Sequence, residues 1–323
     1  MTHHQALKLP HELPLARYRF DFTVERELRL PEYAGSTLRG AFGHALRRAA
    51  CMTRQKECGG CPLQQSCPYT RLFAPTADNR LSSSFRQTPP APYIIEAPEN
   101  GRTGYGKGET FSFEMVLLGR ARSRLPLIAH SFQQAFRRGI GPLRGQGVLG
   151  NIAVETPEGW QSIFADGHIL PHPDTLVLPR RYPETCTLHI RTPIRLQSKS
   201  SVLGIRRVQA GILLRQLMRR ISAIATRYWE MPLEAEFGKL AAVADSIPNH
   251  ADLQWQDWTR YSNRQQQKMV LGGITGTWQF NSLPLAFAQL LYIGQWLHIG
   301  KETVFGLGRY QLSEPPGHED QLC

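Results

Sequence analysis

The chain opens its first half with apolar and polar residues in alternation, and residues 17–30 (RYRFDFTVERELRL) are therefore predicted to form a β-strand. Ser36 is a suitable N-cap for a following helix over residues 37–50. Apolar residues recur every fourth position along this helix, at Leu38, Phe42 and Leu46. This spacing gives the helix one buried face.

The same two periodicities predict the remaining elements of both halves. In the first half they indicate strands at 92–97 and 109–118, a helix at 125–138 and a strand at 147–155. In the second half they indicate a strand at 185–192, a helix at 205–229, strands at 253–262 and 269–280, a helix at 283–297 and a strand at 308–312. Each half thus has the order strand, helix, strand, strand, helix, strand. This order predicts an α+β fold with two tandem ferredoxin-like (RRM-like, βαββαβ) domains.

The predicted domains are residues 1–155 and 185–323, joined by a polar, proline-rich linker over 156–184. The first domain carries a Cys-rich insertion at 51–75, and the second a Gly-rich loop at 299–308. A length of 323 residues agrees with two domains, since one domain typically takes about 150 residues.

The chain is strongly basic, with 38 Lys and Arg against 26 Asp and Glu. A net charge of +12 favours a polyanionic partner such as nucleic acid. The helix at 205–229 concentrates this charge, and no acidic residue occurs between Arg206 and Tyr228. Its candidate phosphate contacts are Arg206, Arg207, Arg215 and Arg219, although a solvated helix face is the alternative.

No apolar run reaches the roughly 18 residues of a membrane span, and the N-terminus lacks the pattern of a secretory signal. The cysteines are not spread as a disulfide framework. We therefore expect a cytoplasmic protein without a membrane partner.

The segment 298–310 (HIGKETVFGLGRY) is the most specific local signal. Glycines allow a backbone to approach phosphates and present amide groups to them, and flanking basic side chains add charge. The candidate RNA contacts here are Gly300, Lys301, Gly306, Gly308 and Arg309. A plain helix-to-strand turn is the alternative.

This segment resembles the glycine-rich loop of the CRISPR repeat-cleaving endoribonucleases, which belong to the RAMP superfamily. Residues 38–43, 139–145, 258–264 and 271–276 are also similar to that family, so the resemblance spans nearly the whole chain. It implies an endoribonuclease that binds CRISPR repeat RNA and cuts precursor transcripts into guide RNAs. Arg39 and Arg144 become candidate RNA contacts. Because guide-RNA-binding RAMP subunits of CRISPR effector complexes share the loop without processing activity, a non-catalytic subunit is the alternative.

Metal-independent RNA cleavage needs a base for the 2′-hydroxyl, an acid for the leaving 5′-oxygen and cations for the phosphorane. It leaves a 2′,3′-cyclic phosphate and a 5′-hydroxyl. His44 has the right chemistry and lies off the apolar stripe of the first helix, with Arg47 and Arg48 three and four residues further on. Arg47 is a candidate RNA contact. A plain surface histidine is the alternative, and His298 beside the glycine loop is the rival catalytic histidine.

The resembled family commonly places a tyrosine before this helix, a histidine on it and a basic residue after the histidine. Tyr33, His44 and Arg48 match that arrangement. The family often has lysine where this chain has Arg48, and arginine does not replace lysine in proton transfer. The resemblance therefore implies that Arg48 stabilises phosphate charge, while Tyr33 or His44 transfers protons.

The acidic residues are dispersed, so we expect no catalytic metal. The insertion has four cysteines, separated by six, two and five residues: Cys51, Cys58, Cys61 and Cys67. Four thiolates fill a tetrahedral shell, so the spacing favours a structural zinc ion, with an iron–sulfur cluster, a disulfide or unligated thiols as alternatives. Four aromatic residues, Tyr33, Tyr105, Trp258 and Tyr261, are candidates either for stacking on unpaired bases or for core packing.

Overall fold

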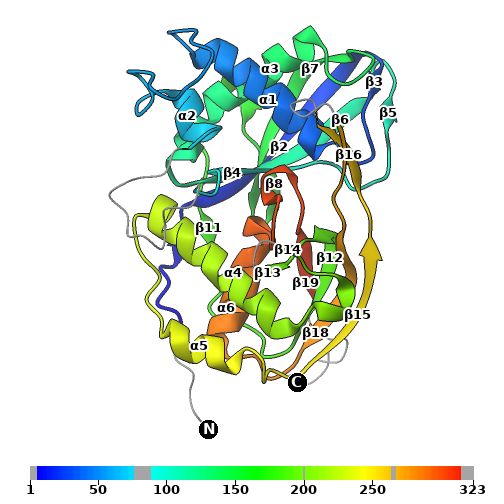
Figure 1. Cartoon of the computed structure of the whole chain (residues 1–323). Coiled ribbons are helices and arrows are strands. Elements are labelled where there is room, and N and C mark those ends of the chain that lie inside the picture. Colours follow the sequence, from blue (N-terminus) through cyan, green and yellow to red (C-terminus); the bar gives the residue numbers. More distant parts are fainter. Residues whose placement is uncertain (1–5, 76–88, 199–200, 263–266, 314–323) are drawn as a thin grey trace, which may run out of the picture. The chain divides into compact units, whose positions relative to one another are not determined.

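The computed structural model describes residues 6–75, 89–198, 201–262 and 267–313 (Figure 1), with the backbone alone at 259–262 and 267–270. The chain forms two compact units. The N-terminal unit comprises Glu12–Val177 and Arg227–Glu230, and the C-terminal unit comprises Leu178–Thr226 with the described residues before Glu12 and from Met231 onward. Each unit contains helices and a sheet, which confirms the α+β prediction.

The N-terminal unit is built on a five-stranded antiparallel sheet. Its strand order is β4 (Tyr93–Glu96), β6 (Thr110–Leu118), β2 (Leu15–Arg26), β7 (Gln146–Thr156) and β8 (Gly159–Ser162). Helices α1 (Gly35–Ala50) and α3 (Leu125–Arg138) contact each other on one face of this sheet (Figure 1). The alternation along β2 directs Phe20 and Phe22 to that face, where they meet Phe132 and Phe136 of α3 at ring distances of 5.6 and 3.9 Å.

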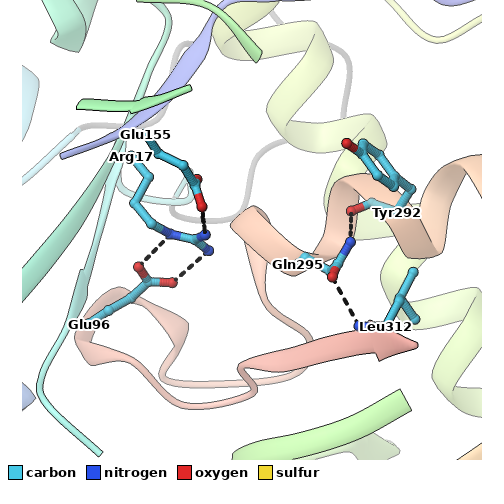
Figure 2. A network of polar contacts seen from close by, with 6 residues as sticks. All are labelled: Arg17, Glu96, Glu155, Tyr292, Gln295 and Leu312. Atoms are coloured by element: carbon cyan, nitrogen blue, oxygen red, sulfur yellow. Dashed lines mark hydrogen bonds and ion pairs between the residues drawn. The ribbon is translucent and has the colours of Figure 1, made fainter. Parts of the chain in front are cut away.

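The opposite face of the same sheet is polar but closely packed. Arg17 is only 7% exposed, and its guanidinium group is bound on two sides by carboxylates (Figure 2). Its Nε lies 2.8 Å from Oε2 of Glu96, and its Nη1 lies 3.0 Å from Oε1 of Glu155. These three residues come from β2, β4 and β7, so the ion pairs connect strands across the sheet.

The C-terminal unit has a four-stranded antiparallel sheet. Its strand order is β15 (Asn249–Gln256), β18 (Gly273–Phe280), β12 (Cys186–Ile194) and β19 (Tyr310–Ser313). Helices α4 (Ala210–Ile224) and α6 (Leu285–Leu297) pack together in this unit. Gln295 ties α6 to β19, because its Oε1 accepts the N–H of Leu312 at 2.9 Å (Figure 2).

Short elements complete both units. In the N-terminal unit these are β1 (Glu12–Leu13), β3 (Leu28–Arg29), α2 (Pro68–Leu72), β5 (Gly104–Tyr105), η2 (Gly119–Arg124), β9 (Phe164–Ala165), β10 (His168–Ile169), β11 (Leu176–Val177) and the π-turn η4 (Ala225–Trp229), which it shares with the other unit. In the C-terminal unit they are β13 (Gln197–Ser198), β14 (Ser201–Val202), η3 (Ile205–Arg207), α5 (Phe237–Val243), β16 (Thr259–Ser262), β17 (Gln267–Val270) and η5 (Thr303–Phe305).

Three predictions about chain organisation differ from the structure. Residues 156–184 are not a plain linker: β8 extends the N-terminal sheet, and Ile163 is buried there with its N–H bonded to the carbonyl of Ile152. The N-terminal domain does not begin at residue 1, because the backbone of Leu7 hydrogen-bonds Gln289 of α6 in the C-terminal unit.

The third difference concerns the helix predicted over 205–229. Residues Val208 and Gln209 are extended, so a short 3-10 turn precedes α4, and the helix proper begins at Ala210. Its last turn widens into a π-turn at Ala225–Trp229. In the described part of the chain, no helix has the length and apolar character to cross a membrane.

Candidate active site

A polar cavity of about 430 Å³ lies between α1 and the end of α3. Helix α1 contributes Ala41, His44 and Arg48, which share one face because they stand three and four residues apart. The remaining lining residues come from α3 and the loop after it, and are Ala135, Arg138, Gly139 and Arg144. The cavity therefore gathers one histidine and three arginines from segments about 90 positions apart.

A tight glycine turn delivers Arg144 to this cavity. Helix α3 ends at Gly139, whose φ of 94° is accessible mainly to glycine, and any Cβ there would lie 2.6 Å from the carbonyl oxygen of Arg144. Ile140 and Gly145 then exchange both backbone hydrogen bonds at 2.9 Å. Arg144 itself has a positive φ of 51°, a conformation that the closed turn maintains.

The electrostatics of the cavity favour an anion. None of its lining residues is acidic, so the three guanidinium groups meet no counter-charge within the lining. Partial burial and the positive charge of Arg138 both lower the pKa of Arg48. A phosphate group would relieve this repulsion, and the exposed His44 would stand beside it as a proton donor or acceptor.

Arg39 and Arg47, which were predicted to contact RNA, do not line the cavity. The Arg47 guanidinium donates to the carbonyl oxygens of Gln55 and Lys56 at 2.5 and 2.6 Å. The guanidinium group of Arg39 lies 4.5 Å from the ring centroid of Phe73. Arg47 stands three residues after His44, but its guanidinium is turned toward the Cys-rich segment and does not line the cavity. Tyr33 is half-buried before α1 and is not among the residues that line the cavity.

The four cysteines of the Cys-rich segment, defined as residues 51–67, line a second cavity of about 140 Å³. All four are half-buried free thiols. The N–H of Arg54, the hydroxyl of Thr53 and the charge of Arg47 together lower the pKa of Cys51. Within the residues described here, however, no three His, Cys, Asp or Glu side chains stand close enough together to share a metal ion.

The glycine loop at 299–308 uses its amide groups within the chain. The N–H groups of Lys301, Gly306 and Gly308 donate to the carbonyls of Arg195, Thr303 and Pro193 at 3.0, 3.0 and 3.1 Å. The positive φ angles of its glycines, 91° at Gly300 and 77° at Gly308, serve this close packing. Contacts with a ligand would therefore come from side chains such as the exposed Lys301 and the half-buried Arg309.

The rival histidine, His298, is fully buried beside this loop, and its Nδ1 donates to the carbonyl of Leu307 at 3.0 Å. Its place in the core supports a structural role, in contrast to the exposed His44.

The arginines of the basic helix have different environments. Arg215 pairs with Asp245, with its Nη1 2.7 Å from Oδ2 and its Nη2 2.9 Å from Oδ1. Arg206, Arg207 and Arg219 are exposed. The helix itself carries no acidic residue, as predicted. However, Asp245, which follows α5, supplies a carboxylate to this surface from outside the helix.

Two family models match the chain. Residues 13–175 match AF_1859_N, described as an N-terminal domain, and residues 188–310 match CRISPR_Cas6, described as CRISPR-associated endoribonuclease Cas6. The second match identifies residues 188–310 as a domain of the Cas6 endoribonuclease family.

Solved structures share the fold of this chain. A partial Cas6-RT-Cas1–Cas2 complex has a TM-score of 0.60 at 16% identity, covering 97% of this chain and 48% of that one. A Thermus thermophilus Cas6 product complex has a TM-score of 0.57 at 15% identity, covering 92% and 98%. An RAMP protein binding different RNA substrates has a TM-score of 0.50 at 8% identity, covering 93% and 100%. The chain spans about half the length of the first of these, and no curated protein sequence matches it.

Several features of the site were not predicted from the sequence. Arg138 lines the cavity, and its only signal in the sequence is its place just before the helix-ending Gly139. Trp258 and Tyr105 are buried, at 3% and 4% exposure, so they are core residues and do not form stacking surfaces. Trp255 is exposed instead. The side chain of Tyr261 and the whole of Arg264 lie outside the described residues.

Proposed function

We propose that this chain is a Cas6-type endoribonuclease, which binds CRISPR repeat RNA and cleaves precursor transcripts into guide RNAs at the cavity between α1 and α3. The observation that supports this most is the convergence of His44 with Arg48, Arg138 and Arg144 around one polar cavity. A phosphodiester in this cavity would meet three cations and a group that transfers protons near neutral pH.

In the proposed reaction the ribose 2′-oxygen attacks the adjacent phosphorus, and the bond from phosphorus to the 5′-oxygen of the next nucleotide breaks. The 2′-hydroxyl loses its proton to a base and the 5′-oxygen receives one from an acid, which leaves a 2′,3′-cyclic phosphate and a 5′-hydroxyl. His44 takes one of these roles. For Tyr33 to take the other, its side chain must turn toward the cavity, which it does not line in the structure. The three arginines stabilise the charge of the phosphorane but do not transfer protons. The scheme uses no metal ion, because the arginines take the charge-stabilising role and side chains transfer the protons.

The two sheets have the same strand order, in which the second, third, first and fourth strands of each βαββαβ unit are neighbours. We take this order as support for tandem ferredoxin-like domains, with the Cys-rich segment inserted in the first. Repeat RNA is the proposed partner, together with other subunits of a CRISPR effector complex, and the cytoplasm is the proposed location.

The Cys-rich segment is proposed to hold one structural zinc ion. Its four thiols line a common cavity, and their number and chemistry suit a closed tetrahedral site without an open position for catalysis. Binding would require the sulfurs to move closer together than they are in the structure. The segment is mostly exposed and rich in turns, so little packing opposes such a movement.

A cleavage assay in EDTA tests the proposed function. The protein is expected to make one discrete cut in repeat RNA, and a 2′-deoxy substitution 5′ of the cut is expected to abolish it. His44→Ala should retain binding but slow single-turnover cleavage by about 10²–10⁴-fold, the usual worth of general acid–base catalysis.

His130→Ala is the matched control, because His130 is an exposed histidine of α3 that does not line the cavity. Binding without any cut by the wild-type protein would instead identify a non-catalytic guide-RNA-binding subunit. Normal cleavage by His44→Ala would show that the chemistry lies elsewhere.

A further inference from the structure

An exposed tryptophan lies on the edge strand β15 of the C-terminal sheet. Trp255 is 38% exposed, and among the large apolar side chains that are exposed in the described residues it is the only aromatic one. Burial normally removes most of the surface of an indole from water. A tryptophan that keeps this much of its surface exposed is a candidate contact for a ligand.

The indole is held in place from two sides. Its Nε1 donates to Oδ1 of Asp257 at 2.8 Å. Its ring lies against Gly272, where an added Cβ would be 2.5 Å from Cζ2 of the indole and 2.6 Å from Oδ1 of Asp257. Glycine is therefore needed at position 272 for space. The ring cannot rotate freely, so binding on its exposed side would cost little conformational entropy.

A series of contacts connects this indole to the glycine loop. Nη1 of Arg195 donates to the carbonyl oxygen of Gly272 at 2.7 Å. The carbonyl oxygen of Arg195 in turn accepts the N–H of Lys301 at 3.0 Å, and Gly300 packs against the Arg195 backbone. The indole is thus connected through Gly272 to the guanidinium of the half-buried Arg195, and the Arg195 backbone in turn holds the backbone of the exposed Lys301.

We propose that Trp255 is a stacking platform for an unpaired base of bound RNA, and that Arg195 and Lys301 attract the adjacent phosphate. An aromatic face beside positive charge is the combination that binds single-stranded nucleic acid with little sequence preference. Two carboxylates offset part of the local positive charge: Glu302 interacts with the charge of Arg195, and Asp257 accepts the indole N–H. The inference rests on the proposed function only in taking RNA as the ligand, and it does not involve His44.

Binding of a single-stranded RNA of about 12 nucleotides, with 2-aminopurine at one position, tests this platform. Trp255→Ala should weaken binding about 5- to 150-fold, the equivalent of one base stack of roughly 1–3 kcal/mol. Trp255→Phe should retain most of the affinity because it keeps an aromatic face. Quenching of 2-aminopurine should occur with the wild-type protein and be lost with Trp255→Ala. A duplex of the same length should show no such dependence on Trp255.

Trp160→Ala is the matched control, since Trp160 is a half-buried tryptophan of β8 that lies beside Arg19 in the other unit. Trp160→Ala should bind the single-stranded RNA as tightly as the wild-type protein does. If Trp255→Ala has an unchanged circular dichroism spectrum and binds the single strand as tightly as Trp160→Ala does, the platform is refuted.

Cleavage measured over a range of protein concentrations separates this proposal from the proposed active site. Trp255→Ala should raise the protein concentration needed for half-maximal cleavage by about the factor by which it weakens binding, while His44→Ala should bind without cutting. If His44→Ala cuts normally and Trp255→Ala binds weakly, the platform stands and the cavity is refuted as the active site.

Discussion

Arg138 offers the sharpest test of the cavity, because its role depends entirely on the tertiary arrangement. It is the last residue of α3 and lines the cavity with His44 and Arg48. Replacing it with alanine removes one of three cations near the phosphate. We expect Arg138→Ala to slow the chemical step more than it weakens RNA binding, since binding involves many phosphates and the transition state only one.

The exposure of Arg138 sets the size of this effect. Two unit charges about 4 Å apart interact by about 1 kcal/mol in bulk water and about 4 kcal/mol near a protein surface. Arg138 is exposed, and Arg48 and Arg144 remain in the variant, so a loss of roughly 1.4–2.8 kcal/mol is reasonable. This corresponds to a cleavage rate about 10- to 100-fold lower.

A single-turnover assay with protein in excess over repeat RNA measures this rate without a contribution from product release. Arg137→Ala is the matched control, because Arg137 precedes Arg138 on α3, is equally charged and exposed, and does not line the cavity. Arg138→Lys should fall between the two, since it keeps the charge but loses the planar donor group. If Arg138→Ala and Arg137→Ala cleave at the same rate while His44→Ala is inactive, the arginines of the cavity do not stabilise the reacting phosphate.

Two further predictions concern the metal and the basic helix. The purified protein should contain about one zinc ion per chain, and Cys61→Ser should lose the zinc and melt at a lower temperature, whereas Cys186→Ala should retain it because Cys186 is buried on β12 in the C-terminal unit. A metal-free wild-type protein would contradict this. Arg219→Glu should reduce the dependence of RNA affinity on salt, by about 0.7 in the log–log slope for each phosphate that is no longer neutralised, whereas Arg215→Ala should change the slope less because Asp245 already pairs with Arg215. Equal slopes in titrations of Arg219→Glu and the wild-type protein would show that this face of α4 does not bind RNA.

Periodicity predicted the elements that carry the cavity. The helix predicted at 125–138 has the observed bounds of α3, and α1 begins only two residues before its predicted start. His44 and Arg48 could be paired from the sequence because residues four apart on a helix are neighbours. Arg138 and Arg144 could not be assigned to the same site from the sequence, because only the packing of α3 against α1 brings them to the cavity. The sequence contains no periodic signal for such packing.

Charge along the chain was a weaker guide than hydrophobic pattern. No acidic residue occurs within the basic helix, yet Asp245 pairs with Arg215 from 30 positions away. The glycine loop shows a similar limit: its glycines were predicted to present amides to phosphate, but the amides of Gly306 and Gly308 donate to the carbonyls of Thr303 and Pro193. In both cases the residue types were informative, while their partners depended on folding.

Helix α1 connects the two candidate sites of the N-terminal unit. A helix turns by about 100° per residue, so the consecutive Arg47 and Arg48 point to different surroundings. Arg48 lines the cavity with His44, while Arg47 holds the carbonyls of Gln55 and Lys56 in the Cys-rich segment. Any metal that orders this segment would therefore act on the same helix that positions the candidate catalytic histidine. On this argument the proposed zinc ion supports catalysis through the position of α1, and its removal should reduce cleavage without any contact between metal and RNA.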